Sequence, residues 1–262
     1  MAEARVVFDD AAAYERFMGR WSRAVGEKFL AWLDPPRGAN WLDVGCGTGA
    51  FSQLVIDRCA PRALTGVDPA PAQIEHARKA LPQVKFEVGD ALALPFGDGE
   101  FDIVASALVL HFLPDRAKAF DEMRRVLAAK GMVAGYTWNR TADSTFAPYA
   151  PMARGIKSLG LPLTLSPLVP EAAPEGLQAT LRKAGFDDIV IDLIEATESY
   201  RDFDEYWEVQ TLPFHPIGQS IAALSPSDRA RLNDTMRKML PALSDGRISY
   251  SSRAIAFKAW KR

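Results

Sequence analysis

Residues 41–49 read Trp-Leu-Asp-Val-Gly-Cys-Gly-Thr-Gly, an apolar run that breaks into three alternating glycines. Because glycine has no Cβ, the chain can turn sharply at the end of a strand, and its backbone can lie directly against a ligand. Residues 50–56 are predicted to be helical, so the free N–H groups at the helix start would face the same space. The stretch therefore predicts a strand, a tight turn and a helix that bind a ligand together.

A second predicted strand ends at Val67-Asp68. A carboxylate at this position can accept hydrogen bonds from both hydroxyls of a ribose. The glycine turn and Asp68 together predict a site for a cofactor that contains a nucleoside. The glycine spacing alone also satisfies the loose dinucleotide fingerprint G-x-G-x-x-[G/A], so an NAD-dependent oxidoreductase is an alternative at this point.

The same stretch and the segments that follow it favour a different family. Residues 42–49 resemble motif I of the class I S-adenosylmethionine (SAM)-dependent methyltransferases, and residues 89–91 resemble the motif that reads the adenine edge in that family. Residues 101–104 resemble its fourth strand, and residues 125–133 resemble the helix, turn and fifth strand that follow. The resemblance covers residues 38–138, with weaker agreement at 171–195 and 246–262, and the layout is similar to the type 11 or ubiquinone/menaquinone-biosynthesis-like group. It carries little information about the substrate.

The resemblance implies SAM as the cofactor and gives roles to particular residues. Asp68 would hold the ribose, and Asp90 with the backbone of Ala91 would read the adenine. Asp43 would support the amino group of SAM through the loop or through water. Further cofactor contacts are expected from the turn, from the ends of the second and fourth strands and from an N-terminal segment that folds over the cofactor: Gly45, Cys46, Gly47, Pro69, Leu108, Tyr14 and Arg20.

His111 is the candidate catalytic residue. It follows the fourth predicted strand, at the carboxyl edge where open α/β sheets bind ligands. Methyl transfer from a sulfonium is an in-line displacement with an activated leaving group, so the protein mainly positions the reactants and excludes water. An amine, alcohol or carbon acid would also lose a proton at some stage, and His111 could accept it. The alternative for His111 is a packed or hydrogen-bonded loop histidine.

Composition limits the function further. A chain of 262 residues with 48% apolar content can bury one large core. Its 31 basic and 33 acidic side chains give a net charge of −2, which provides no general attraction to nucleic acid. The two cysteines cannot form a disulfide framework, we find no arrangement of acidic residues that suggests a metal site, and no apolar run is long enough to span a bilayer. We expect a cytoplasmic protein that acts on a small molecule, whose oligomeric state the sequence leaves open.

Strands and helices alternate along the chain. Short apolar runs are separated by helical stretches near 49–59, 71–81 and 115–129, with Gly131 after the last helix; the runs lie at 40–44, 63–67, 84–88, 101–107 and 131–137. This alternation predicts parallel strands joined by right-handed crossovers. A helix near 173–184 and strands at 186–194 and 252–260 complete a doubly wound, seven-stranded, mostly parallel sheet of the Rossmann-like α/β class.

We expect one domain over residues 1–262. Residues 1–37 would form a helical segment over the cofactor, and residues 139–170 and 201–245 would form a helical cap. The expected reaction is methyl transfer from SAM to a small, partly apolar acceptor through an oxygen, nitrogen or carbon nucleophile. The alternatives are a non-catalytic SAM-binding regulatory module and the NAD-dependent oxidoreductase, for which we find no Tyr/Lys or His catalytic set.

Overall fold

The computed structural model describes residues 15–140, 149–165, 169–213, 215–240 and 242–262. The chain divides into two compact units. Unit 1 consists of residues 1–21, 142–168 and 196–252, and unit 2 of residues 22–141, 169–195 and 253–262. The glycine turn and Asp68 both belong to unit 2.

The sheet has seven strands in the order β3-β2-β1-β4-β5-β7-β6. Neighbours among the first five strands are parallel, and β7 runs antiparallel to β5. The predicted seven-stranded, mostly parallel, doubly wound sheet is therefore confirmed. The bounds are β1 (Asn40–Val44), β2 (Ala63–Asp68), β3 (Lys85–Val88), β4 (Phe101–Ala107), β5 (Leu127–Trp138), β6 (Phe186–Tyr200) and β7 (Ile248–Lys261).

The order of the strands reverses between β1 and β4, which are neighbours in the sheet although β2 and β3 lie between them in sequence. The connections from β1 and from β4 therefore leave the sheet in opposite directions. In open α/β sheets the crevice at such a reversal is where ligands bind. The glycine turn follows β1 at this point.

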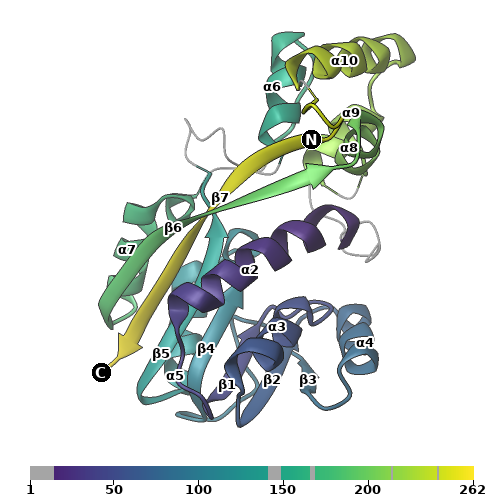
Figure 1. Ribbon diagram of the computed structural model, residues 1–262. Helices are drawn as coiled ribbons and strands as arrows, with labels where there is room; N and C mark the ends of the chain where they lie inside the picture. Colours follow the sequence, from purple (N-terminus) through teal and green to yellow (C-terminus); the bar gives the residue numbers. More distant parts are fainter. Residues whose placement is uncertain (1–14, 141–148, 166–168, 214, 241) are drawn as a thin grey trace. The chain divides into compact units, whose positions relative to one another are not determined.

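Helices cover both faces of the sheet in unit 2 (Figure 1). One face carries α2 (Arg20–Leu33), α3 (Ala50–Cys59) and α4 (Pro71–Ala80), and the other carries α5 (Arg116–Val126) and α7 (Pro174–Lys183). On the first face the ring of Phe29 lies 6.0 Å from that of Phe51 and 5.0 Å from that of Tyr136. These contacts join α2, α3 and β5 through one aromatic cluster.

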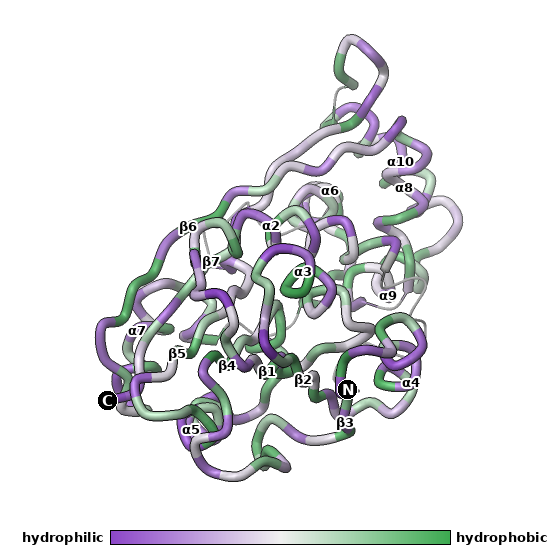
Figure 2. Tube along the Cα trace, turned by 60° about the horizontal axis from the view of Figure 1, so that its bottom comes forward, coloured by the Kyte–Doolittle hydropathy of each residue, from purple (hydrophilic) through white to green (hydrophobic). Residues whose placement is uncertain are grey.

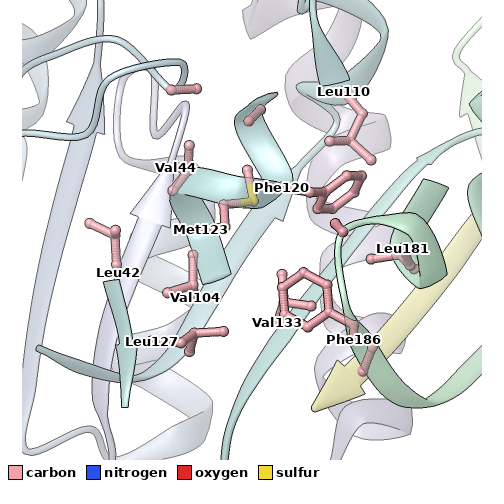
Figure 3. Close-up of a cluster of buried hydrophobic side chains, with 14 of the residues drawn as sticks. Leu42, Val44, Val104, Leu110, Phe120, Met123, Leu127, Val133, Leu181 and Phe186 are labelled. Carbon is pink, nitrogen blue, oxygen red and sulfur yellow. The ribbon is translucent and has the colours of Figure 1, made fainter. Parts of the chain in front are cut away.

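The other face holds the main hydrophobic core (Figure 3). Side chains of the central strands, such as Val44, Val104 and Val133, pack there with Phe120 and Met123 of α5. Leu181 of α7 and Phe186 of β6 close the cluster. Figure 2 shows hydrophobic residues along the central strands and mixed hydropathy along α5, as expected for a helix that buries one face.

The predicted helix at 115–129 is wrong at its C-terminal end. The helix starts as expected, with the Asp115 side chain accepting a hydrogen bond from the backbone N–H of Lys118 at 2.9 Å, but it ends at Val126. Leu127 has an extended backbone and pairs with Phe101 of β4. Gly131 therefore lies inside β5 and does not follow a helix. Leu127 has the spacing of a helical residue, but its pairing with β4 places it in a strand.

The strands at the C-terminal side are longer than predicted. The sequence predicts strands at 186–194 and 252–260, whereas β6 extends to Tyr200 and β7 begins at Ile248. Both strands run from unit 2 into residues of unit 1. The apolar runs identified only part of each strand.

Unit 1 is mainly helical. It contains the π-helical turn η1 (Glu15–Gly19), α6 (Ala150–Ser158), α8 (Phe203–Gln210), α9 (Pro216–Ala222) and α10 (Pro226–Met239). Ser225 caps α10, since its hydroxyl accepts a hydrogen bond from the N–H of Asp228 at 3.1 Å. The helices α6 and α9 both begin with a proline in their first turn, where proline is tolerated.

Packing inside unit 1 follows from a few residues. Tyr206 is fully buried, with its ring 5.3 Å from that of Tyr200 and 6.0 Å from that of Tyr250. Gly155 lets α6 approach α10, because a Cβ there would lie 2.3 Å from the sulfur of Met236.

Whether residues 1–37, 139–170 and 201–245 act as cofactor segment and cap stays a prediction. No helix in the described part of the chain is long and apolar enough to cross a membrane.

Arg125, in the last turn of α5, fixes the segment between β3 and β4. Its guanidinium donates to the carbonyl oxygens of Leu94 and Phe96 at 2.9 and 2.7 Å and to both carboxylate oxygens of Glu122 at 2.8 and 3.0 Å. Glu122 in turn accepts the N–H of Leu94 at 2.8 Å. Arg125 lowers the pKa of Glu122, which favours the charged pair. One arginine thus satisfies a carboxylate and two backbone carbonyls.

We expect Arg125→Met to lower the free energy of unfolding by about 2 kcal/mol at pH 7, because Glu122 would keep a charge without its partner. Thermal denaturation followed by circular dichroism measures the change. Arg58→Met is the matched control, since Arg58 and its partner Glu27 are 59% and 47% exposed and such pairs contribute little. Equal melting temperatures for the two variants would contradict the role given to Arg125.

Candidate functional site

The turn after β1 depends on Gly45, whose φ is +75°. Its N–H donates to the carbonyl oxygen of Val67 at 2.7 Å, and the next N–H, of Cys46, donates to the same oxygen at 3.1 Å. A Cβ at Gly45 would lie 2.4 Å from a methyl group of Val109, which follows β4. Only glycine allows the turn to bend in this way and to touch the loop after β4.

Gly47 is the open part of the turn. Its φ is +53°, and a Cβ built on it would meet nothing closer than Oε1 of Gln73 at 4.0 Å. This glycine therefore does not avoid a clash with the protein. Open space beside a backbone that needs glycine fits a ligand lying directly on the turn.

Asp68, at the end of β2, is held in place by two backbone groups. One carboxylate oxygen accepts the N–H of Gly47 at 3.1 Å, and the other accepts the N–H of Ala70 at 2.9 Å. Burial raises the pKa of this carboxyl, and the two N–H groups oppose the rise. Each oxygen retains a second lone pair. The side chain is thus oriented beside the open turn and can still accept two hydrogen bonds.

Asp43 is buried in β1, with 1% of its surface exposed. The hydroxyl of Ser52, in the first turn of α3, donates to one carboxylate oxygen at 2.7 Å, whereas the other oxygen has no hydrogen-bond partner among the described residues. Burial raises the pKa of Asp43 to about 7; the Ser52 hydrogen bond opposes this and the negative charge of Asp68 adds to it. A buried carboxyl with one unpaired oxygen fits a polar or cationic ligand group.

Ser52 was not among the predicted site residues. Its place in the first turn after the glycines was a signal, because a small hydroxyl there can reach back to the preceding strand. The sequence alone did not show that Asp43 faces α3. Strand alternation allows either face, and packing decides which.

The remaining residues predicted around the turn have different surroundings. The Cys46 side chain is buried, and burial raises the pKa of its thiol, so only its backbone lies at the turn. Pro69 is exposed beside Asp68. Leu108 is buried with φ +60°, and its N–H donates to the carbonyl oxygen of Tyr136 at 2.8 Å. The left-handed backbone of Leu108 turns the chain toward Gly45.

Asp90 and Ala91 follow β3. A carboxylate oxygen of Asp90 accepts the N–H of Leu92 at 2.9 Å, and the carbonyl oxygen of Asp90 accepts the N–H of Ala93 at 3.0 Å. Asp90 is exposed and Ala91 is buried at the margin of the core. The segment is an ordered turn with a free side of the carboxylate, so its adenine-reading role stays a prediction.

Two predicted cofactor residues lie in unit 1 of the sequence. Tyr14 falls outside the described residues. Arg20 forms an ion pair with Glu205 at 2.6 Å, donates to the carbonyl oxygen of Ser199 at 3.3 Å and lies 5.6 Å from the ring centre of Tyr200. These contacts tie η1 and the start of α2 to the α8 region of the same unit, and a cofactor contact of Arg20 stays a prediction.

The three histidines differ in their surroundings. His76 is exposed on α4. His215 is buried in unit 1, where its Nδ1 accepts the N–H of Gly218 at 3.2 Å and caps α9, and burial lowers its pKa to about 4. His111 lies in the 3-10 turn η2 (Leu110–Phe112), with its Nδ1 buried and without a hydrogen-bond partner among the described residues. Burial lowers the pKa of His111 to about 3, and the charges of Arg140 and Arg116 add to this effect.

Among the described residues, no group of three or more His, Cys, Asp or Glu side chains is placed to hold a metal ion.

Comparison with known proteins gives the site its context. Residues 42–135 match a family model described as a methyltransferase domain. The chain is 36% identical over 111 residues to a 2-methyl-6-phytyl-1,4-hydroquinone methyltransferase of Synechocystis, and this match covers 41% of the chain and 35% of the relative. It is 38% identical over 127 residues to a malonyl-[acyl-carrier protein] O-methyltransferase of Geobacter sulfurreducens, with coverage of 47% and 45%. The chain thus spans half or less of the length of these relatives.

The fold is similar to solved structures over nearly the whole chain. One is the phospholethanolamine N-methyltransferase 2 of Haemonchus contortus, solved with phosphomonomethylethanolamine and S-adenosylhomocysteine. The similarity has a TM-score of 0.55 at 19% identity and covers 97% of this chain and 57% of that one. This similarity shows the fold, and residues 42–135, which match the methyltransferase domain model, contain the glycine turn, Asp68 and most of the strands around them.

Proposed function

We propose that the protein transfers a methyl group from SAM to a small, partly apolar acceptor. The observation that carries this proposal is the edge where β1 and β2 end. There the open backbone of Gly47 lies beside Asp68 and near Asp43, a buried carboxyl with an unpaired oxygen. This set of groups suits a nucleoside that also carries a positive charge.

The donor and acceptor groups of the site fit SAM. Asp68 would accept hydrogen bonds from the ribose hydroxyls with the lone pairs that Gly47 and Ala70 leave free. Asp43 would stabilise the amino group of the cofactor, acting either through the loop or through water. Asp90 and Ala91 are proposed for the adenine, and the backbone of Gly45, Cys46 and Leu108 for the methionine part, with Pro69 beside the ribose.

SAM, when bound, supplies a methyl group on an activated sulfur leaving group. The protein then has to hold the acceptor in line and exclude water. We propose that His111 faces the acceptor as a neutral imidazole, because a pKa of about 3 leaves it uncharged at pH 7. Such an imidazole can hydrogen-bond an acceptor well, but it is a weak general base.

The relatives support a small acceptor, since their names give a hydroquinone and a malonyl group on a carrier protein. A net charge of −2 supports the proposal that the acceptor is not a nucleic acid. A cytoplasmic location stays a prediction from the sequence.

Calorimetric titration with SAM, S-adenosylhomocysteine and NAD in parallel tests the cofactor. We expect binding of both sulfur nucleosides and no binding of NAD. Binding of NAD alone would contradict the proposal and favour hydride transfer. Binding of SAM without methyl transfer to any acceptor in a broad screen would favour the regulatory module.

We expect Asp68→Asn to weaken SAM binding by on the order of 1–3 kcal/mol, because an amide has one acceptor oxygen while Gly47, Ala70 and the ribose all require acceptors. Calorimetry measures the affinity. Asp57→Asn, an exposed carboxylate on α3, is the matched control and should leave the affinity unchanged. Unchanged affinity in Asp68→Asn would refute the ribose assignment.

Asp43 gives a prediction about pH. Its pKa is about 7 in the fold against an ordinary value of 3.8, so ionised Asp43 destabilises the ligand-free protein increasingly from pH 4 to pH 7. We therefore expect the melting temperature of Asp43→Asn, relative to the native protein, to rise over this range and to level off above it. The same variant should bind SAM more weakly, because the negative charge is lost. A difference in melting temperature that does not change with pH would show that the pKa of Asp43 is not raised in the folded protein.

A further inference from the structure

Gln73 is a polar residue on the buried face of α4. It lies in the first turn of the helix, beside Ile74 and one turn before Ala77, and all three residues are buried. Glutamine is mostly an exposed residue type, whereas only 5% of Gln73 is exposed. Its amide oxygen Oε1 is buried and has no hydrogen-bond partner among the described residues. The amide therefore needs an explanation that the packing of α4 does not provide.

The face of α4 that carries Gln73 lies against the glycine turn. A Cβ at Gly49 would lie 3.5 Å from the Cβ of Ala77, so the helix packs on the end of the turn at this residue. Residues four apart lie on the same face of a helix, which directs Gln73 toward the earlier part of the turn. Apart from Gly47 and its chain neighbours, Oε1 of Gln73 is the nearest atom to a Cβ built on Gly47, at 4.0 Å.

Two different acceptor groups are thus found next to Gly47. Its N–H donates to a carboxylate oxygen of Asp68 at 3.1 Å, and Oε1 of Gln73 faces the open space at its Cα. The carboxylate is an acceptor that carries charge, whereas the amide is a neutral acceptor. A buried acceptor without a donor costs stability, because its hydrogen bonds to water are lost. A ligand that lies on Gly47 and carries a donor would remove this cost.

We propose that Gln73 is a cofactor-binding residue whose amide oxygen accepts a hydrogen bond from a ribose hydroxyl. This inference rests on the proposed function and adds a residue to its nucleoside site. A ribose has two neighbouring hydroxyls, and each can donate one hydrogen atom. With Asp68 and Gln73 both next to Gly47, the site has acceptors for both hydroxyls, and the buried oxygen of Gln73 gains a partner.

The proposal gives Gln73 opposite effects on stability and on binding. Gln73→Met replaces the amide by an unbranched apolar side chain that adapts to its surroundings. In the ligand-free protein the change removes an unpaired buried acceptor, so we expect the melting temperature to stay the same or to rise. The affinity for S-adenosylhomocysteine should fall by about fivefold, as for the loss of one neutral hydrogen bond. A residue that only supports the fold would lower the melting temperature and leave the affinity unchanged.

Ligands that lack one hydroxyl identify the hydrogen bond. S-adenosylhomocysteine and its 2′-deoxy and 3′-deoxy analogues are titrated calorimetrically into the native protein and into Gln73→Met. We expect the loss caused by the substitution to disappear with the analogue that lacks the partner hydroxyl and to persist with the other analogue. Gln73→Leu, a second apolar replacement, should give the same pattern.

Gln83→Met is the matched control, because Gln83 is exposed in the turn that follows α4. It makes the same chemical change in the same unit, and it should leave the melting temperature and all three affinities unchanged.

Two results would overturn the role of Gln73. Either both apolar variants bind S-adenosylhomocysteine as tightly as the native protein does, or they weaken S-adenosylhomocysteine and both deoxy analogues by the same factor. Failure of the proposed function is a different result, since the native protein would then not bind S-adenosylhomocysteine, and the role of Gln73 would be excluded with it.

Discussion

The contact between Gly45 and Val109 is the constraint on which the candidate site at the ends of β1, β2 and β4 depends. A side chain at position 45 would overlap Val109 at 2.4 Å, so the turn after β1 and the loop after β4 can meet only because this residue is glycine. The contact lies where the strand order reverses, and it brings together two connections that leave the sheet in opposite directions. The orientation of Asp68 follows from it, since the same turn presents the N–H of Gly47 to that carboxylate.

Two ionisable groups of the site have pKa values that are shifted in opposite directions, and each shift favours the uncharged form. Burial raises the pKa of the Asp43 carboxyl to about 7 and lowers that of the His111 imidazole to about 3. In both residues one polar atom is left without a hydrogen-bond partner in the described structure. Unsatisfied buried polar atoms are costly, and two of them lie here, on β1 and in the turn η2. Their arrangement agrees with a site that is completed by a polar cofactor and a polar acceptor.

Much of the fold could be predicted because unit 2 repeats simple patterns. The strands β1, β2 and β4 begin where predicted, since their residues form continuous apolar runs bounded by glycine, proline or charged residues. The errors occurred where tertiary contacts override local preference. Leu127 pairs with Phe101 and ends α5 early, and β6 and β7 extend beyond the predicted strands.

The sequence by itself determined the order of strands and helices, the glycine turn and the carboxylate at the end of β2. These features are local, because they depend on residue type and spacing along one stretch of chain. Only the tertiary structure decided that Ser52 binds Asp43, that Val109 requires Gly45, and that Arg116 of α5 binds the carbonyl oxygen of Leu110. Those relations join residues from different strands and turns, and no periodicity along the chain encodes which side chains meet when the sheet assembles.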